Sequence, residues 1–398
     1  MAETEIISNS ESNEQFFEGV EKLIEIWFTP EKNADLRRIT RQQWENVLKI
    51  VRCEIISFTQ SEQVDAYVLS ESSMFVSRRR WILKTCGTTT PLRCVRAVLA
   101  LARDVAGHAR VHNVFYSRRE FARPHAQLQP HDNFDSEVST VVAILSILAL
   151  YRLLIHKNTH TLYPKQKLKA HKSWKTVFQP RLTVSPHNSF WSKCNVKLLD
   201  SFFGDGRAYI MGPDQDCWYL YTLLPLEGTV DALEKEQREE TSPGQSEPDQ
   251  TIEILMSDLD PAVMDIFTRA YSQDAAQATR VHEPIFFMFI MMTHTMVLPS
   301  GCYMTIHITP ERACSYVSFE SNVPVASYDE VIARVLRAFR PNKFVLTVFA
   351  TPDAPAASGG ERSLKQFPSL DEYSAAEAQH CKFSGYSLHY ALYCKFPS

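Results

Sequence analysis

The sequence predicts an α+β protein that is built from large antiparallel sheets and has two similar halves. Short stretches rich in aromatic and β-branched side chains recur along the chain, and helical patterns separate groups of these stretches. Strand-like stretches lie on both sides of a polar tract at 228–250. This arrangement indicates that the tract is a linker between the halves.

Composition narrows the class of protein. The 398 residues suffice for one large β-rich domain or two average ones, and a net charge of −4 gives no electrostatic footprint for nucleic acid. Nine cysteines without a C-x-x-C pair indicate reduced thiols and a cytosolic protein. Residues 1–15 are acidic and polar, so we expect a disordered tail rather than a targeting leader.

The first predicted element is a short amphipathic helix within 16–28. Its apolar positions form one stripe, and Glu18, Glu21 and Glu25 would project together from the other face. Two interpretations are open: a solvated acidic face, or a group of carboxylates suited to a diamine or another cation. A second helix is expected at 41–51.

Residues 66–77, AYVLSESSMFVS, are interpreted as a strand with a polar centre. The apolar residues on both sides favour a buried strand, whereas Ser70-Glu71-Ser72-Ser73 places four polar groups where each must be matched. One interpretation is a Ser-rich turn at a strand end. The other is a site of backbone and hydroxyl chemistry.

The remaining elements are predicted from the spacing of apolar residues, which repeats about every 3.6 residues in a helix and every second residue in a strand. Helices are expected at 90–105, 261–270 and 328–339, and strands at 53–59, 81–86, 111–118, 207–212, 217–224, 251–257, 303–309, 315–321, 343–350 and 386–394.

Two segments differ in composition from their neighbours. An atypical insertion at 138–197 has no Asp or Glu and opens with the apolar run 141–155, whose length is marginal for spanning a bilayer. An atypical segment at 280–300 is crowded with Met and Phe without a clear period. The His pairs 108/112 and 156/160 have helical spacing but no third ligand, so no metal site is predicted.

Several sequence blocks resemble the eukaryotic S-adenosylmethionine decarboxylase proenzymes, which are pyruvoyl-dependent. In chain order these blocks are FFEGVEKLIEIWF, YVLSESSMFVSRRRWILKTCGTT, VFYSRREF, DCWYLYTL, PDQTIEILMSDLDPAVMD, YMTIHITPE and SYVSFESN. They cover most of the chain outside the two atypical segments, and LSESSMFVS is the most specific of them.

The resemblance implies a four-layer αββα sandwich of two antiparallel eight-stranded sheets, formed by a single domain over 16–398. It also implies autocatalytic cleavage between Glu71 and Ser72, which would give a β chain 1–71 and an α chain 72–398. Ser72 would become a pyruvoyl cofactor, whose ketone forms a Schiff base with S-adenosylmethionine and accepts electrons as CO₂ leaves. The product would supply aminopropyl groups for spermidine and spermine.

The family's motifs also assign roles around this bond. Cys86 in KTCGT would be the proton donor in decarboxylation, although without the motif it would be interpreted as a buried structural thiol. His307 in TIHITPE would be the base of self-cleavage. The other implied contacts are Glu18 and Glu21 as active-site carboxylates, Phe17 stacking on adenine, Glu311 binding the ribose hydroxyls, and Glu71 through its main chain.

A second acidic group resembles the family's putrescine site, where a diamine activates processing and decarboxylation in animal members. Asp249, Thr251 and Glu253 alternate by two, so one strand would present all three on one face. Buried carboxylates at this density need counter-charge, which a dication supplies. The full set is Glu25, Lys84, Phe115, Asp249, Thr251, Glu253, Glu320 and Phe349.

The chain departs from the family pattern in the atypical segments. Family members carry a block like F-x-P-C-G-Y-S-M-N before TIHITPE, with an adenine-stacking Phe and a Ser that works with the His in processing. This chain has VHEPIFFMFIMMTHTMVLPSGCYM instead. Thr293 lies at a comparable distance before His307, but its surroundings differ and we assign it no role.

Three alternatives follow from these departures. The chain is an uncleaved, catalytically impaired homologue that acts as a regulatory or structural partner subunit, or its gene model retains non-coding sequence in both segments, or 141–155 is a membrane anchor. Against the last, we expect no membrane partner. The family implies a dimer of αβ units.

Overall fold

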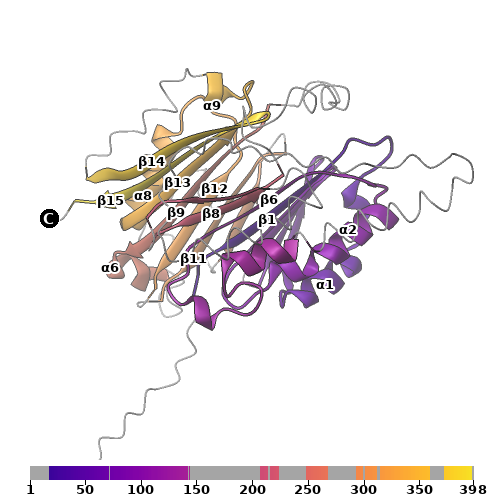
Figure 1. Ribbon diagram of the computed structural model, residues 1–398, viewed down its shortest axis with the longest axis horizontal. Coiled ribbons are helices and arrows are strands. Elements are labelled where there is room, and N and C mark those ends of the chain that lie inside the picture. Colours follow the sequence, from indigo (N-terminus) through magenta and orange to yellow (C-terminus); the bar gives the residue numbers. More distant parts are fainter. Residues whose placement is uncertain are drawn as a thin grey trace, which may run out of the picture.

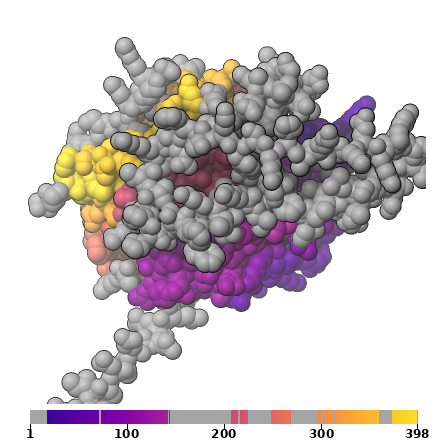
Figure 2. All heavy atoms as spheres, in the orientation of Figure 1, coloured from indigo at the N-terminus to yellow at the C-terminus, as the bar shows by residue number. Residues whose placement is uncertain are grey.

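Two antiparallel sheets dominate the computed structural model, which describes residues 18–70, 72–141, 143, 207–213, 216–223, 248–267, 293–298, 301–311, 314–358 and 372–396. Each sheet comes from one half of the chain, as the sequence predicts. In the space-filling view the two halves, indigo to magenta and orange to yellow, lie side by side (Figure 2).

The first sheet has eight strands in the order β2-β3-β4-β5-β1-β6-β8-β7, and neighbours pair antiparallel. The strands are β1 (Lys22–Phe28), β2 (Ile55–Gln60), β3 (Val64–Leu69), β4 (Ser72–Ser77), β5 (Arg80–Thr85), β6 (Val111–Arg119), β7 (Arg207–Met211) and β8 (Trp218–Thr222). The strand β1 therefore lies in the interior of the sheet, between β5 and β6.

Helices α1 (Arg41–Ile50) and α2 (Val95–Asp104) cover the outer face of this sheet (Figure 1). The short helices η1 (Leu36–Arg38), η2 (Pro91–Cys94) and η3 (Pro124–Ala126) lie in its connections, and 134–141 is helical. Thr40 and Gln43 form a capping box that starts α1. Trp44 of α1 stacks on Trp81 of β5 with ring centroids 6.5 Å apart, so the apolar stripe of α1 packs on the sheet.

The second sheet has seven strands among the described residues, in the order β10-β11-β12-β9-β13-β15-β14. Helix α8 (Asp329–Phe339) and the shorter α6 (Pro261–Met264) and η4 (Asp265–Phe267) pack on its outer face, and α9 (Pro355–Ser358) follows β13. The strands are β9 (Gln250–Leu259), β10 (Thr293–Val297), β11 (Tyr303–Thr309), β12 (Tyr316–Ser321), β13 (Pro341–Ala350), β14 (Tyr373–Phe383) and β15 (Tyr386–Lys395).

Apolar side chains fill three spaces between four layers. One core lies between the first sheet and its helices, and a second lies between the second sheet and α8. Two further clusters, which include Trp218 with Val345 and Phe75 with Tyr303, join the inner faces of the sheets. The predicted four-layer αββα sandwich is therefore confirmed, with seven described strands where the resemblance implied eight.

The helix expected within 16–28 is wrong, because residues 22–28 form β1. Glu21 and Glu25 are four residues apart, a spacing that places side chains on one face of a strand as well as of a helix. Ile24 and Ile26 face the helical layer, whereas Glu25 and Trp27 face the second sheet. A strand that is buried on both faces lacks the regular alternation of apolar and polar residues, so its sequence can match the apolar spacing of a helix.

The strand expected at 66–77 is instead a hairpin of β3 and β4. Leu69 pairs with Ser72, so the chain reverses within the polar centre of that stretch. The interpretation as a turn was therefore right about the backbone. Sequence patterns missed β14 and β10, and β10 lies inside the atypical segment 280–300.

Candidate active site between the sheets

A buried lysine joins the two sheets at the centre of the site. Lys84 of β5 is fully buried, and its Nζ forms ion pairs with Glu320 of β12, with Glu253 of β9 at 3.2 Å and with Glu21 at 3.6 Å. Burial would lower the pKa of Lys84, but these three carboxylates raise it well above its usual value. Lys84 therefore stays charged and fixes the carboxylates of the second sheet over the first.

The carboxylates around Lys84 exceed its charge. Burial raises the pKa of Glu253 to about 7, and its neighbours Glu320 and Glu21 add to this effect against the attraction of Lys84. The Tyr303 hydroxyl donates to Glu320. The interpretation of Glu18, Glu21 and Glu25 as a solvated acidic face is therefore wrong, because all three side chains are buried.

Glu21 also contacts His307 of β11, which the resemblance implies as the base of self-cleavage. The Glu21 carboxylate pairs with Nδ1 of His307, and the Ser318 hydroxyl lies 3.5 Å from the same nitrogen. Burial would raise the pKa of Glu21, but His307 and Lys84 lower it to about 2. Among the described residues, the buried Nε2 of His307 has no hydrogen-bond partner, so it is the nitrogen that can take a proton.

A threonine that sequence reasoning set aside lies beside this histidine. Thr293 of β10 is the cross-strand partner of His307 on one side, and Ser318 of β12 is the partner of His307 on the other side. Strand β10 packs against β3 and β4. Gly301, in the turn after β10, approaches Gln63 before β3 so closely that a Cβ would lie 2.4 Å from Oε1. Thr293 is at the other end of β10, toward the turn between β3 and β4.

Strand register places Ser72 next to Cys86. Ser72 pairs with Thr85 at the end of β5, and Cys86 follows directly and is 7% exposed. The Thr89 hydroxyl donates to the Cys86 carbonyl at 2.6 Å, and the N–H of Gly87 donates to the carbonyl of Glu18 at 3.0 Å. The bond expected to break and the expected proton donor therefore lie at the same end of neighbouring strands.

Glu18 and Glu311 lie near this end of the sheets. The Glu18 carboxylate accepts from the backbone N–H groups of Ala122 and Arg123 and from Gln127, and burial raises its pKa despite these bonds. Burial also raises the pKa of Glu311, whose Oε2 has no hydrogen-bond partner within the described ranges. Glu18 is thus held by the fold, whereas Glu311 has an acceptor atom to offer.

A second ion-pair group lies beside the first. Arg80 of β5 pairs with Glu25 of β1 and with Asp249 at 3.1 Å, and its guanidinium lies 4.8 Å from the centre of a Trp27 ring. The Tyr386 hydroxyl donates to Asp249 at 3.2 Å. Burial raises the pKa of Glu25 against the attraction of Arg80. As predicted, Asp249 and Glu253 project toward the same inner space.

Aromatic rings of the apolar core between the sheets adjoin these charges. Phe115 contacts Phe349 edge to face at 5.7 Å and Trp27 at 6.2 Å. Within the described part of the chain, the buried hydroxyl of Thr251 has no hydrogen-bond partner. All eight residues expected for a diamine site thus lie in the described structure. Ion pairs join Lys84 to Glu253 and Glu320, and Arg80 joins Glu25 to Asp249.

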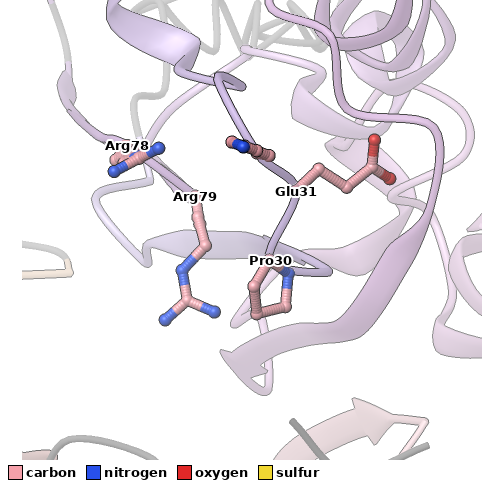
Figure 3. A pocket seen from close by; sticks show the side chains of 5 residues that line it. Pro30, Glu31, Arg78 and Arg79 are labelled. Atoms are coloured by element: carbon pink, nitrogen blue, oxygen red, sulfur yellow. The ribbon is translucent and has the colours of Figure 1, made fainter.

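Phe17 and Glu71 lie outside the described residues, as does the side chain of Ser72. A pocket of about 330 Å³ is lined by residues that include Glu31, Arg78 and Arg79 (Figure 3). Its arginines form the turn between β4 and β5, at the opposite end from Ser72 and Cys86.

Comparison with known proteins agrees with the geometry. A family model described as adenosylmethionine decarboxylase matches residues 14–175 and 143–394. The chain belongs to the adenosylmethionine decarboxylase family. It is 38% identical to the S-adenosylmethionine decarboxylase proenzyme of Drosophila melanogaster, with 96% of each chain covered, and 35% identical to that of Xenopus laevis, with 97% of each covered.

Among solved structures, the chain is similar to an AdoMetDC-delta26 monomer of Trypanosoma brucei. That comparison has 20% identity and a TM-score of 0.34, and it covers 65% of this chain and 92% of the other. The chain itself has two large antiparallel sheets and few helices among its described residues. No helix in the described ranges is long and apolar enough to cross a membrane.

Proposed function

We propose that this chain is a carboxy-lyase that decarboxylates S-adenosylmethionine after cutting itself between Glu71 and Ser72. The observation that carries this proposal is the register of β4 and β5, which pairs Ser72 with the residue before Cys86. Membership of the family and the names of its relatives support the activity. The resemblance adds that the product donates aminopropyl groups and that the enzyme is a cytosolic dimer of αβ units.

Self-cleavage uses the hydroxyl of Ser72. Its oxygen attacks the carbonyl carbon of Glu71, the C–N bond breaks, and an ester with a free amine at residue 72 forms. Loss of the Ser72 Cα proton then releases Glu71 as a carboxylate. The remaining enamine takes up water and loses ammonia, which leaves the pyruvoyl group. A tight reversal supports this step, because Leu69 pairs with Ser72 and Ser72 therefore begins β4 directly after the hairpin turn.

His307 and Thr293 are the groups that we assign to proton transfer in this cleavage. Glu21 holds Nδ1 of His307, which leaves Nε2 to accept a proton. Thr293 lies in register with His307 on a strand that packs against the cleavage hairpin. We assign this residue the role of the family's serine on its strand register, although the surrounding sequence block differs.

The substrate is a sulfonium, and acidic groups near a fixed cation stabilise its binding. We assign Glu18 and Glu21 to this end of the site, and Glu311 to the ribose hydroxyls because its Oε2 has no partner among described residues. By resemblance, Phe17 stacks on adenine and the Glu71 main chain contacts the substrate. Cys86 returns a proton to the α-carbon after CO₂ has left. The pyruvoyl group, when formed, supplies the electron sink.

A diamine such as putrescine fits the charges beside this site. Five carboxylates, those of Glu21, Glu25, Asp249, Glu253 and Glu320, face the two cations Lys84 and Arg80. A dication offsets most of this excess, and buried carboxylates need such compensation. Thr251 offers a hydroxyl without a partner in the described structure, and Phe115 and Phe349 suit the methylene chain.

The test is intact mass measurement of the purified chain with assay of CO₂ release from carboxyl-labelled substrate. We expect two polypeptides divided between Glu71 and Ser72, a carbonyl at the start of the larger one, and CO₂ release. The Ser72→Ala variant should remain one inactive chain. A wild-type chain that stays intact and releases no CO₂ would overturn the proposal and favour an uncleaved partner subunit.

A further inference from the structure

A second buried polar network lies on the outer face of the first sheet, under the helical run 134–141. Its centre is Glu137, which is fully buried. The Glu137 carboxylate accepts from the Tyr116 hydroxyl at 2.6 Å, from Nε of Arg118 at 2.7 Å and from Nδ1 of His131 at 2.7 Å. None of the steps proposed above uses these groups.

Lys22 extends this network from β1 to the loop that carries Cys86. It shares the outer face with Ile24 by strand alternation, and it is fully buried. Its Nζ donates to the carbonyl of Gly87 at 2.8 Å and lies 5.4 Å from the centre of the Phe121 ring. A buried ammonium that donates to the residue after Cys86 controls both the position of the loop and the local charge.

Five charged or titratable groups surround Lys22, and they are Cys86, Glu137, Glu18, Arg118 and His131. Burial lowers the pKa of Lys22 to about 8, while Cys86, Glu137 and Glu18 raise it and Arg118 lowers it further. Burial also lowers the pKa of His131 to about 4, so this imidazole is neutral at physiological pH. The negative charge of Glu137 is therefore shared between Arg118 and Lys22, which helps Lys22 remain an ammonium.

We propose that Lys22 is a positioning residue for Cys86, which holds the loop through the Gly87 carbonyl and places a positive charge at the residue that follows Cys86. This inference rests on the proposed function, in which Cys86 is the proton donor. A nearby ammonium stabilises the thiolate, which makes the thiol a stronger acid. Lys22 thereby increases the capacity of Cys86 to give up a proton during turnover.

The test measures Cys86 itself rather than turnover. The rate of alkylation by iodoacetamide is followed against pH for the full chain, with Cys86 identified by peptide mass. We compare Lys22→Met and Lys22→Gln with Lys22→Arg, and Lys49→Met at the exposed end of α1 is the matched control. Lys22→Gln can still donate to Gly87 but has no charge, so it separates the hydrogen bond from the electrostatic effect.

We expect the midpoint of alkylation to move to higher pH by about one unit or more in Lys22→Met and Lys22→Gln. Lys22→Arg and Lys49→Met should retain the wild-type midpoint. An unchanged midpoint in Lys22→Gln would overturn the inference, even if Lys22→Met fails to fold. The proposed function fails separately, if the wild-type chain stays intact and releases no CO₂ whatever the alkylation midpoint; Cys86→Ser that decarboxylates at the wild-type rate would remove only the role of Cys86.

Discussion

Thr293 and His307 are cross-strand partners. The strand that carries Thr293 packs against the hairpin of β3 and β4, and Ser72 is the first residue of β4. A hydroxyl residue therefore accompanies His307 although the family's serine block is absent. The position opposite His307 can therefore be occupied without the family's serine block, because antiparallel register depends on strand pairing and not on the sequence around one residue.

Replacing Thr293 tests this relationship. Thr293→Ala should slow self-cleavage about 100-fold, the scale of a lost proton-transfer group, whereas Thr293→Ser should cleave like the wild type. Denaturing electrophoresis over time measures the rate. Thr295→Ala on the same strand is the control, because Thr295 faces Thr305 rather than His307. Equal cleavage rates for Thr293→Ala and wild type would contradict the assignment.

The pKa of Glu253 predicts how putrescine binding depends on pH. Because burial raises this pKa to about 7, Glu253 takes up a proton as pH falls below 7 and no longer attracts a cation. The amines of putrescine stay charged, since such groups have a pKa near 10. Affinity should fall by up to about tenfold per pH unit below 7. Calorimetry in buffers of different ionisation enthalpy should show proton release on binding.

The Glu253→Gln variant is the control for that dependence. It should bind putrescine more weakly and with little change between pH 6 and pH 8. If the wild type binds equally well at both values, Glu253 does not take part in the site.

Arg80 neutralises the buried carboxylate of Glu25 and the partly buried carboxylate of Asp249. Arg80→Met leaves Glu25 and Asp249 uncompensated, so we expect a loss of about 3–5 kcal/mol in the free energy of unfolding. Denaturant unfolding measures this loss. A triple variant that adds Glu25→Gln and Asp249→Asn should recover most of it. A loss of equal size in the triple variant would show that packing on Trp27 matters more than charge.

Gly19 allows the segment before β1 to touch β11. A Cβ at Gly19 would lie 2.0 Å from the Thr309 hydroxyl and 2.3 Å from its Cβ. Gly19→Ala should therefore lower the free energy of unfolding by about 1–3 kcal/mol, as overpacking does. Adding Thr309→Gly should restore stability, whereas Thr309→Ala should not, because its Cβ remains. Thermal denaturation distinguishes the two double variants.

His131 predicts one source of acid destabilisation. Its pKa is about 4 when folded and about 6.5 when unfolded, so between these values only the unfolded chain is protonated. Stability should fall as pH decreases from 6.5 to 4, by about 3 kcal/mol in total. Denaturant unfolding of uncleaved Ser72→Ala protein measures the slope. His131→Asn should flatten it, and the exposed His125→Asn should leave it unchanged.

Sequence patterns predicted the large antiparallel sheets and most strands, and the resemblance implied the four layers and the acidic group, but neither predicted how the N-terminal segment folds. Glu21 and Glu25 fit a helix and a strand equally well, and only the partners across the sheets decide between them. The network around Glu137 had no local signal, because Tyr116 and Arg118 reach it from β6 and His131 from the connection that follows η3. For Lys22, a residue in a recognised motif, only burial and the Gly87 carbonyl indicate a role.

The interior position of β1 has a consequence for the order of events in the life of this protein. A cut between 71 and 72 would assign β1 to the smaller piece, while both of its neighbours, β5 and β6, belong to the larger. The smaller piece alone would lack partners on either edge of β1, and the larger piece would have a gap in its sheet. The fold must therefore be complete before the bond breaks, and the separated pieces should not reassemble once unfolded.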